Sequence, residues 1–251
     1  MTDVPLKKYA IIVAGGSGTR MNSVVPKQFL KLDGRPVLMH TITKFSEVNQ
    51  NIEIIVVIPP DHLATWQQLC AEYQFNIPHR IVEKGETRFQ SVKNALAFVT
   101  ETGIVAVHDA ARPLVDSKII ITAYKAAEMY GTGVPAIPLN DSIRQIDSTL
   151  SIAVDRSKYC IIQTPQCFKT EIIKKAYEQD YKFTFTDDAT VVESTGEKIR
   201  LIDGHSDNMK ITNPRDFIIA EALLKNKPAT TPPNKLKLSD DLNILNKQES
   251  G

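Results

Sequence analysis

The sequence has little of what marks nucleic-acid-binding or membrane proteins. Its 30 Lys and Arg residues are balanced by 29 Asp and Glu residues, and only 7% of the residues are aromatic, so a basic surface with interleaved aromatic residues for a nucleic acid is not expected. No apolar run approaches the ~18 residues that span a bilayer. Residues 1–8 also lack the apolar core of a signal peptide. We therefore expect a cytoplasmic protein that binds neither nucleic acid nor membrane.

Cysteine is scarce as well. The 3 cysteines, Cys70, Cys160 and Cys167, are too few and too widely spaced for a disulfide framework or a four-ligand zinc site. We expect all of them to be reduced thiols.

The composition changes once along the chain, near residue 228. Over the whole sequence, 42% hydrophobic and 24% charged residues are typical of a globular protein, and residues 1–227 are predicted to form a single catalytic domain. Residues 228–251 contain Pro228, Pro232 and Pro233 and no aromatic residue. This composition predicts a flexible tail, with at most one short helix over residues 239–246.

Short β-branched apolar runs alternate with segments of helical periodicity, which predicts βαβ units. The predicted strands are residues 9–13, 52–58, 80–82, 104–107, 134–139, 160–163 and 198–202. Helices are predicted around residues 38–45, 92–99, 117–129 and 170–177. Asn213 and Pro214 predict the N-cap and first residue of a last helix that buries Phe217, Ala220 and Leu224. The predicted fold class is α/β, a Rossmann-like, mostly parallel sheet flanked by helices.

One segment, residues 138–159, interrupts this alternation. Residues 143–146 and 152–154 have the alternation of short strands around a turn at 147–149, with no helical period. We expect a β-hairpin arm that projects from the sheet. Because an isolated hairpin is marginally stable in water, the arm predicts a partner surface, and a second copy of the chain is the obvious candidate.

A glycine-rich loop, Ala14-Gly-Gly-Ser-Gly-Thr-Arg-Met21, follows the first predicted strand. Glycines permit positive φ and expose successive backbone N–H groups to an anion. Met21 stands where a dinucleotide fingerprint has its third glycine, so the loop alone is also compatible with a tight structural turn. Arg20 and Lys27 favour phosphate binding, since they can hold a polyphosphate from two directions. The alternative is a pair of solvated surface charges.

Together with Pro26-Lys-Gln-Phe29, this loop resembles nucleotidyltransferases that join a nucleoside triphosphate to a sugar or polyol phosphate. Further motifs, in the same order as in the 2-C-methyl-D-erythritol 4-phosphate cytidylyltransferase family, are Gly85-Glu-Thr-Arg-Phe-Gln-Ser91, His108-Asp-Ala-Ala-Arg-Pro113, Gln163-Thr-Pro-Gln166, Thr186-Asp-Asp-Ala189 and Asp207-Asn-Met-Lys-Ile-Thr212. The resemblance covers about residues 8–225. It implies a nucleotide-diphospho-sugar transferase-like fold and the transfer of CMP from CTP to the polyol phosphate, with release of pyrophosphate.

The resemblance also implies roles for individual residues. Arg20 and Lys27 are the expected catalytic residues, and Mg²⁺ is the expected cofactor. The expected nucleotide contacts are Ala14, Gly15, Gly16, Ser17, Gly18, Thr19, Gly85, Glu86, Arg88, Ser91, Asp109 and Ala110. The expected acceptor contacts are Asp109, Arg112, Arg156, Thr164, Thr186, Asp207 and Lys210, with Arg156 crossing from the arm of a neighbouring subunit in a homodimer.

Several of these residues have ordinary structural alternatives. Asp109 follows a predicted strand and can help to hold Mg²⁺ or accept a ribose hydroxyl, or it can pair with Arg112 and cap the next helix. Ser91 can likewise be only a helix cap, and Thr164 with its following proline only a turn. His108 is expected to be structural, because a phosphate nucleophile needs no general base.

Two other functions remain open at this point. Ribitol 5-phosphate cytidylyltransferases share the glycine loop, Pro-Lys-Gln-Phe and Thr-Pro-Gln, and differ in the polyol. A non-catalytic nucleotide-binding module would need only the loop and the sheet, and the presence of both Arg20 and Lys27 with separate acceptor-phosphate cations disfavours it.

Overall fold

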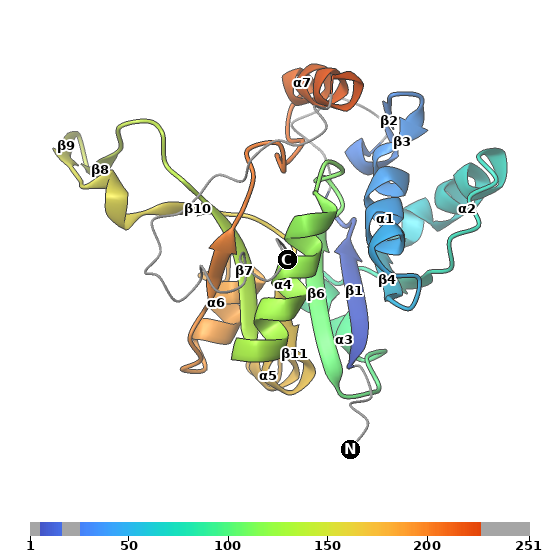
Figure 1. The fold of residues 1–251 in the computed structure, drawn as a ribbon, viewed down its shortest axis with the longest axis horizontal. Helices are drawn as coiled ribbons and strands as arrows, with labels where there is room; N and C mark the ends of the chain where they lie inside the picture. Colours follow the sequence, from blue (N-terminus) through green and yellow to red (C-terminus); the bar gives the residue numbers. More distant parts are fainter. Residues whose placement is uncertain (1–5, 17–25, 227–251) are drawn as a thin grey trace, which may run out of the picture.

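The computed structural model describes residues 6–16 and 26–226 (Figure 1). Five residues of the glycine loop, Ser17, Gly18, Thr19, Arg20 and Met21, lie outside the described residues, as does the predicted tail.

A central sheet has the strand order β10-β7-β11-β6-β1-β4-β5, and β12 also pairs with β7. The strands are β1 (Lys7–Val13), β4 (Glu53–Ile58), β5 (Arg80–Glu83), β6 (Gly103–Asp109), β7 (Thr132–Pro138), β10 (Cys160–Ile162), β11 (Gln166–Lys169) and β12 (Leu201–Asp203). Strands β6, β1, β4 and β5 pair in parallel, as do β7 and β12. Strand β11 is antiparallel to β6 and β7, and β10 is antiparallel to β7. The mostly parallel α/β sheet is confirmed.

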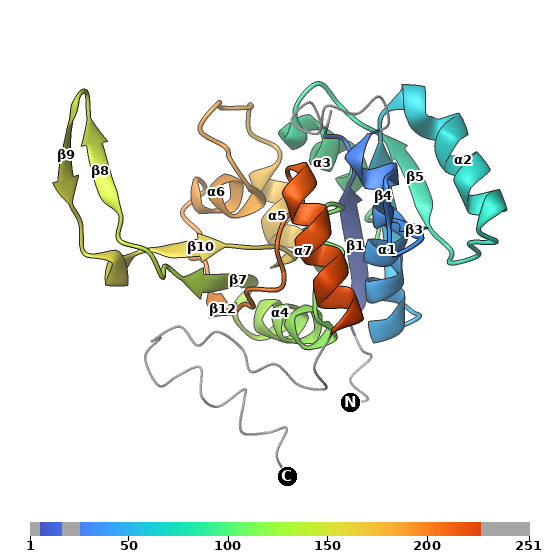
Figure 2. The same cartoon turned by 90° about the horizontal axis from the view of Figure 1, so that it is seen from above.

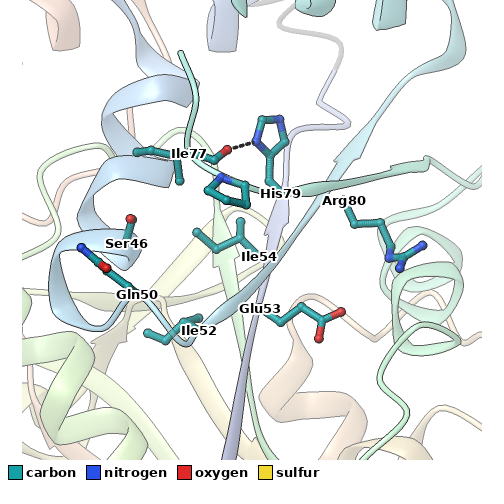
Figure 3. A pocket seen from close by; sticks show the side chains of 9 residues that line it. Ser46, Gln50, Ile52, Glu53, Ile54, Ile77, His79 and Arg80 are labelled. Atoms are coloured by element: carbon teal, nitrogen blue, oxygen red, sulfur yellow. Dashed lines mark hydrogen bonds between the residues drawn. The ribbon is translucent and has the colours of Figure 1, made fainter.

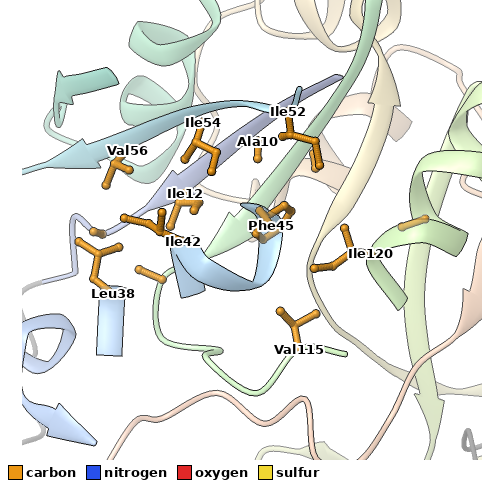
Figure 4. Close-up of a cluster of buried hydrophobic side chains, with 14 of the residues drawn as sticks. Ala10, Ile12, Leu38, Ile42, Phe45, Ile52, Ile54, Val56, Val115 and Ile120 are labelled. Carbon is orange, nitrogen blue, oxygen red and sulfur yellow. The ribbon is translucent and has the colours of Figure 1, made fainter. Parts of the chain in front are cut away.

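Both faces of the sheet are covered, because alternate residues of each inner strand point to opposite faces. Ala10 and Ile12 pack with α1 (Val37–Val48), α2 (Leu63–Glu72) and α4 (Ser117–Tyr130), as Figure 4 shows in part. Tyr9 and Ile11 pack with α3 (Arg88–Leu96), α5 (Thr170–Ala176) and α6 (Asp188–Glu193) on the other face. Within the described part of the chain, none of the helices has the length and apolarity to cross a membrane.

Smaller elements frame this core. A two-stranded sheet of β2 (Lys31–Leu32) and β3 (Arg35–Pro36) precedes α1, and single-turn helices form at Lys27–Phe29, Pro60–His62 and Arg156–Lys158. The last helix, α7 (Pro214–Lys225), begins at the predicted N-cap, Asn213. It buries Ala220 and packs Phe217 and Leu224 against Leu32 and Ile211, as predicted.

The predicted arm is present. Strands β8 (Arg144–Asp147) and β9 (Leu150–Ala153) pair with each other as a separate two-stranded sheet, and every residue in them is exposed. Ser148 has a φ of 57° in the connecting turn. Figure 2 shows the hairpin standing away from the sheet and helices.

Among the strands of the central sheet and the helices that cover it, three elements were not predicted from the sequence. Helix α2 buries only Trp66 fully, so its apolar period is weak. Helix α6 and strand β11 are short, and β11 begins with a buried glutamine, Gln166. Strand β12 also begins at Leu201, three residues after the predicted start at 198.

The N-cap of α7 provides a test of the fold. Asn213 accepts a hydrogen bond from the backbone N–H of Asp216, whose carboxylate accepts in return from the backbone N–H of Asn213. Asn213→Ala removes this capping box and is expected to lower the free energy of unfolding by about 1 kcal/mol in urea titrations. Asn213→Ser, which keeps a capping oxygen, is the control. Equal losses in both variants would contradict the capping role.

Candidate functional site

A cleft of about 330 Å³ lies where the parallel strands end. Strand register sets Val13 opposite both Val57 and Asp109, so the segments after β1, β4 and β6 meet at one edge of the sheet. The cleft is lined by residues 13–16, 27–28, 84–88, 91, 109–111, 210 and 212. Ligands of open α/β sheets bind at such an edge, and the volume lies within the usual range for a small-molecule site.

Lys27 reaches across this cleft. It begins a single helical turn that is fixed by its neighbours, because buried Gln28 donates from Nε2 to the carbonyl of Ala14 at 2.7 Å and Phe29 stacks on Trp66. Lys27 Nζ donates to the carbonyl of Ile211 at 2.9 Å. The cation after the glycine loop is therefore placed beside the 207–212 motif, as a phosphate clamp between the two would require.

The loop at Gly85 is held by side chains of the helix that follows it. Thr87, not Ser91, is the N-cap of α3, so the alternative that Ser91 caps this helix is wrong. The Ser91 hydroxyl instead accepts from the backbone N–H of Gly85 at 3.1 Å and donates to the carbonyl of Thr87 at 2.8 Å. A Cβ at Gly85 would lie 2.2 Å from Gln90 Cγ, so only glycine fits here.

Arg88, the first residue of α3, lines the cleft but has a partner of its own. Its guanidinium donates from Nη1 and Nη2 to the two carboxylate oxygens of Asp188, at 2.8 and 2.5 Å. The Asp188 side chain is fully buried, whereas that of Arg88 is 29% exposed. Burial lowers the pKa of Arg88, but the Asp188 carboxylate more than offsets this and raises it above its ordinary value, so the group stays charged. Arg88 thus presents a fixed edge, and no freely moving cation, to the cleft.

Asp109 connects the 108–113 motif with the 207–212 motif inside the cleft. Its Oδ2 lies 2.9 Å from Lys210 Nζ and 3.5 Å from Arg112 Nε. Arg112 also donates from Nη1 to the carbonyl of Asn208 at 2.6 Å. Burial alone would raise the pKa of Asp109, but the charges of Lys210, Arg88 and Arg112 hold it well below its usual range. The expected pairing with Arg112 is confirmed, whereas the N-cap of the next helix is Asp116 rather than Asp109.

A chain of hydrogen bonds lies under Asp109. The Thr164 hydroxyl accepts from the backbone N–H of Asp109 at 3.1 Å and lies 3.1 Å from His108 Nδ1, while His108 Nε2 lies 3.1 Å from the carbonyl of Arg112. Since a carbonyl can only accept, Nε2 carries the proton and Nδ1 accepts from Thr164. His108 is therefore a neutral structural residue, as expected. Thr164 was expected to contact a substrate hydroxyl, but its own hydroxyl is used in this chain.

The remaining predicted residues are spread around the cleft or away from it. Glu86 and Thr186 are exposed, and Asp207 Oδ1 lies 3.7 Å from His205 Nδ1. Arg156 is on the arm, where it donates to the carbonyl of Asn140, and it is not among the residues that line the cleft of its own chain.

Sequence reasoning missed several residues of this region, three of which have clear roles in the structure. Gln28, Lys84 and Asp188 contact the glycine loop, line the cleft and hold Arg88, respectively. Gln28 and Asp188 lie within quoted motifs, and Lys84 directly precedes one. All three residues were therefore within or next to motifs that the sequence singles out. Their roles could not be predicted, because the contacts that give them a role connect segments distant in sequence.

Asp109 is the residue of the cleft best suited to help hold a divalent cation. Mg²⁺ prefers oxygen ligands and commonly binds one or two carboxylates together with substrate phosphates. Among the described residues there is no cluster of three or more His, Cys, Asp or Glu side chains arranged around one point. The ionised carboxylate of Asp109 fits a metal site of which a phosphorylated substrate supplies part.

A second hollow, of about 480 Å³, lies at the opposite ends of the strands (Figure 3). It is lined by Ser46, Gln50, Ile52, Glu53, Ile54, Ile77, Pro78, His79 and Arg80. Glu53 begins β4, so this is the amino end of the strand. None of the quoted motifs contributes to the lining of this hollow. The motif residues suited to bind phosphate line the smaller cleft instead.

Comparison with known proteins shows which family the chain matches. The family model described as 2-C-methyl-D-erythritol 4-phosphate cytidylyltransferase matches residues 9–226. The chain is similar to proteins of that name from Bacteroides thetaiotaomicron (44% identity, 87% of this chain and 100% of that protein) and from Porphyromonas gingivalis (46% identity, 87% and 98%).

Solved structures show the same likeness. The 4-diphosphocytidyl-2C-methyl-D-erythritol synthase of Anaerococcus prevotii superposes with a TM-score of 0.74 at 29% identity, over 87% of this chain and 96% of that one. The 2-C-methyl-D-erythritol 4-phosphate cytidylyltransferase of Thermus thermophilus gives 0.69 at 28% identity, over 88% and 100%.

The environment of His108 predicts a pH dependence of stability. Burial lowers the pKa of His108 from 6.5 to about 4, so between these values the unfolded chain binds a proton that the folded chain does not. The contribution of His108 to the free energy of unfolding is therefore fully present above about pH 6.5 and is lost as the pH falls towards 4. Between pH 7 and pH 5 the free energy of unfolding should fall by roughly 2 kcal/mol more in the native protein than in His108→Gln. Parallel urea titrations measure this, and equal pH slopes would contradict it.

Proposed function

The chain belongs to the 2-C-methyl-D-erythritol 4-phosphate cytidylyltransferase family, and we propose that its cleft transfers CMP from CTP to 2-C-methyl-D-erythritol 4-phosphate. The products are 4-diphosphocytidyl-2-C-methyl-D-erythritol and pyrophosphate, in isoprenoid precursor biosynthesis. The observation that supports this most directly is the Asp109–Lys210 ion pair, because it joins a residue proposed to contact the nucleotide to a cation proposed to bind the acceptor phosphate.

The reaction is an in-line displacement between two anions. An oxygen of the acceptor phosphate forms a bond to the α-phosphorus of CTP, and the bond from that phosphorus to the bridging oxygen of the β-phosphate breaks, so that the electron pair leaves with pyrophosphate. The acceptor phosphate is already ionised and needs no base. Catalysis then consists of holding both groups in line and neutralising the charge that builds on the α-phosphate and the leaving group.

The chain's own residues divide these tasks. The backbone N–H groups of Gly15 and Gly16 face the triphosphate, since that of Ala14 donates to the carbonyl of Val57. Lys27 neutralises developing charge from the 207–212 side of the cleft. Arg20, the other proposed catalytic cation, lies outside the described residues. The loop from Gly85 to Ser91 receives the cytosine and ribose, and Lys210 with Arg112 attracts the acceptor phosphate.

A magnesium ion belongs to the proposal as well. Asp109, with oxygens of the substrate phosphates, would hold it in the cleft, and it would supply additional charge neutralisation there.

The arm supports a proposed homodimer. Ile146, Leu150 and Ile152 are 78%, 76% and 62% exposed, which is unusual for large apolar side chains. Among the described residues, the two strands of this hairpin pair only with each other. A second copy of the chain would cover them and bring the arm's Arg156 to the partner's acceptor site. The proposal also includes a cytoplasmic location for this dimer.

No observation favours the two alternative functions. The family match and the named relatives specify methylerythritol phosphate rather than ribitol phosphate. A module that only binds nucleotides would have no use for the Lys210 and Arg112 side of the cleft.

The role of Lys27 is tested by substitution. Lys27→Ala is expected to reduce turnover several hundredfold, the rate equivalent of about 3–4 kcal/mol of transition-state stabilisation, with little change in acceptor binding. Pyrophosphate release from CTP measures turnover. Lys225→Ala, which removes an exposed lysine of α7, is the matched control and should behave as native protein. Turnover of Lys27→Ala within a few fold of native would exclude the catalytic role.

The role of the arm is tested by Arg156→Ala. If the arginine binds the acceptor phosphate of a partner subunit, the KM for the acceptor should rise about tenfold or more while the KM for CTP stays the same. Lys158→Ala, two residues along the same exposed turn, serves as the control. An unchanged acceptor KM, or a protein that sediments as a fully active monomer at assay concentration, would rule out this arrangement.

A further inference from the structure

Asp188 is a fully buried carboxylate that has no part in the chemistry described so far. It accepts three hydrogen bonds, from Nη1 and Nη2 of Arg88 and from the hydroxyl of Tyr177 at 2.6 Å. A buried ion pair gives little net stability compared with a well-packed apolar pair of the same volume, because both charges must leave water. What this pair supplies is orientation, since a two-point bond to a planar guanidinium fixes its position and its plane.

One end of this pair lies at the nucleotide side of the cleft. Arg88 is the first residue of α3, directly after the N-cap Thr87, and Ser91 in the same turn holds the backbone of Gly85. Phe89 stacks on Tyr177 with ring centroids 4.6 Å apart. The charge of Arg88 also contributes to the low pKa of Asp109 across the cleft. A shift of Arg88 would therefore move the loop that faces the nucleotide.

The other end is anchored to the sheet. Asp188 is the first residue of α6, and the N-cap before it, Asp187, accepts from Gln166 Nε2 at 2.8 Å. Gln166 Oε1 accepts in turn from the backbone N–H of Ala189 at 2.8 Å. Both sides of the helix start are thus bonded to β11. Thr186, the exposed acceptor candidate, stands two residues before Asp188.

We infer that Asp188 is a positioning residue, which holds Arg88 so that the nucleotide loop from Gly85 to Ser91 keeps a fixed register with the Thr186 segment on the acceptor side. Asp188 touches neither substrate and acts through Arg88. This inference rests on the proposed function, because it concerns where CTP sits relative to the acceptor.

The test compares two substitutions that each remove part of the same buried network. Asp188→Asn keeps the shape but loses the charge and one acceptor for Arg88, and it should raise the KM for CTP about tenfold or more. Tyr177→Phe removes only the third donor, from a residue that does not line the cleft, and should leave the KM for CTP within twofold of native. Both should lower the melting temperature, so a thermal shift alone does not separate them.

The outcomes are distinct. A folded Asp188→Asn with unchanged KM for CTP, or an equal rise in Tyr177→Phe, overturns the inference. If Asp188→Asn does not fold, Arg88→Lys decides, since it keeps a charge opposite Asp188 but loses the two-point bond: a rise in KM for CTP of fivefold or more supports the inference, and an unchanged value overturns it. Failure of the proposed function would instead appear as no pyrophosphate release by native protein with CTP, the acceptor phosphate and Mg²⁺.

Discussion

The cleft depends on the burial of one negative charge, that of Asp109. A carboxylate that leaves water must be compensated. Here the compensation comes from Arg112 at 3.5 Å, three residues further along the chain, and from two other segments, through Lys210 at 2.9 Å and the more distant Arg88. Two of these cations have a further partner, since Arg112 donates to the carbonyl of Asn208 and Arg88 to the carboxylate of Asp188. The need to neutralise Asp109 therefore brings the 85–91 loop and the 207–212 motif together beside the 108–113 motif.

Much of the fold follows from local sequence patterns. The apolar strands of the sheet's centre, the helices packed on them, the Asn213 cap and the arm are each specified by residues close together in the chain, which is why they were predictable. Strand β11 was not, because its place between β6 and β7 depends on partners more than thirty residues away and its first residue, Gln166, is polar. Helix α6 depends on the same glutamine, through Asp187 and Ala189.

The sequence predicts which motifs form the cleft, but not which contacts each of their side chains makes there. The motif residues Gly15, Lys27, Gly85, Asp109 and Lys210 do converge on one cleft. Sequence could not tell which side chains are already committed to the protein itself: Thr164 to His108, Ser91 to Gly85, and Arg88 to Asp188. Such hydrogen bonds depend on which residues are neighbours in three dimensions. They distinguish the residues that shape the cleft from the residues that remain able to bind phosphate.

We propose that one cleft holds both phosphorylated substrates, with Lys27 and Lys210 on the same side of the transferred group. A crystal structure of the protein with CTP and the acceptor phosphate would reveal this arrangement. We expect the triphosphate against residues 14–16 and Lys27, the cytosine at the loop from Gly85 to Ser91, and the acceptor phosphate beside Lys210. Nucleotide bound in the hollow lined by Ile52, His79 and Arg80, with the 330 Å³ cleft empty, would contradict it.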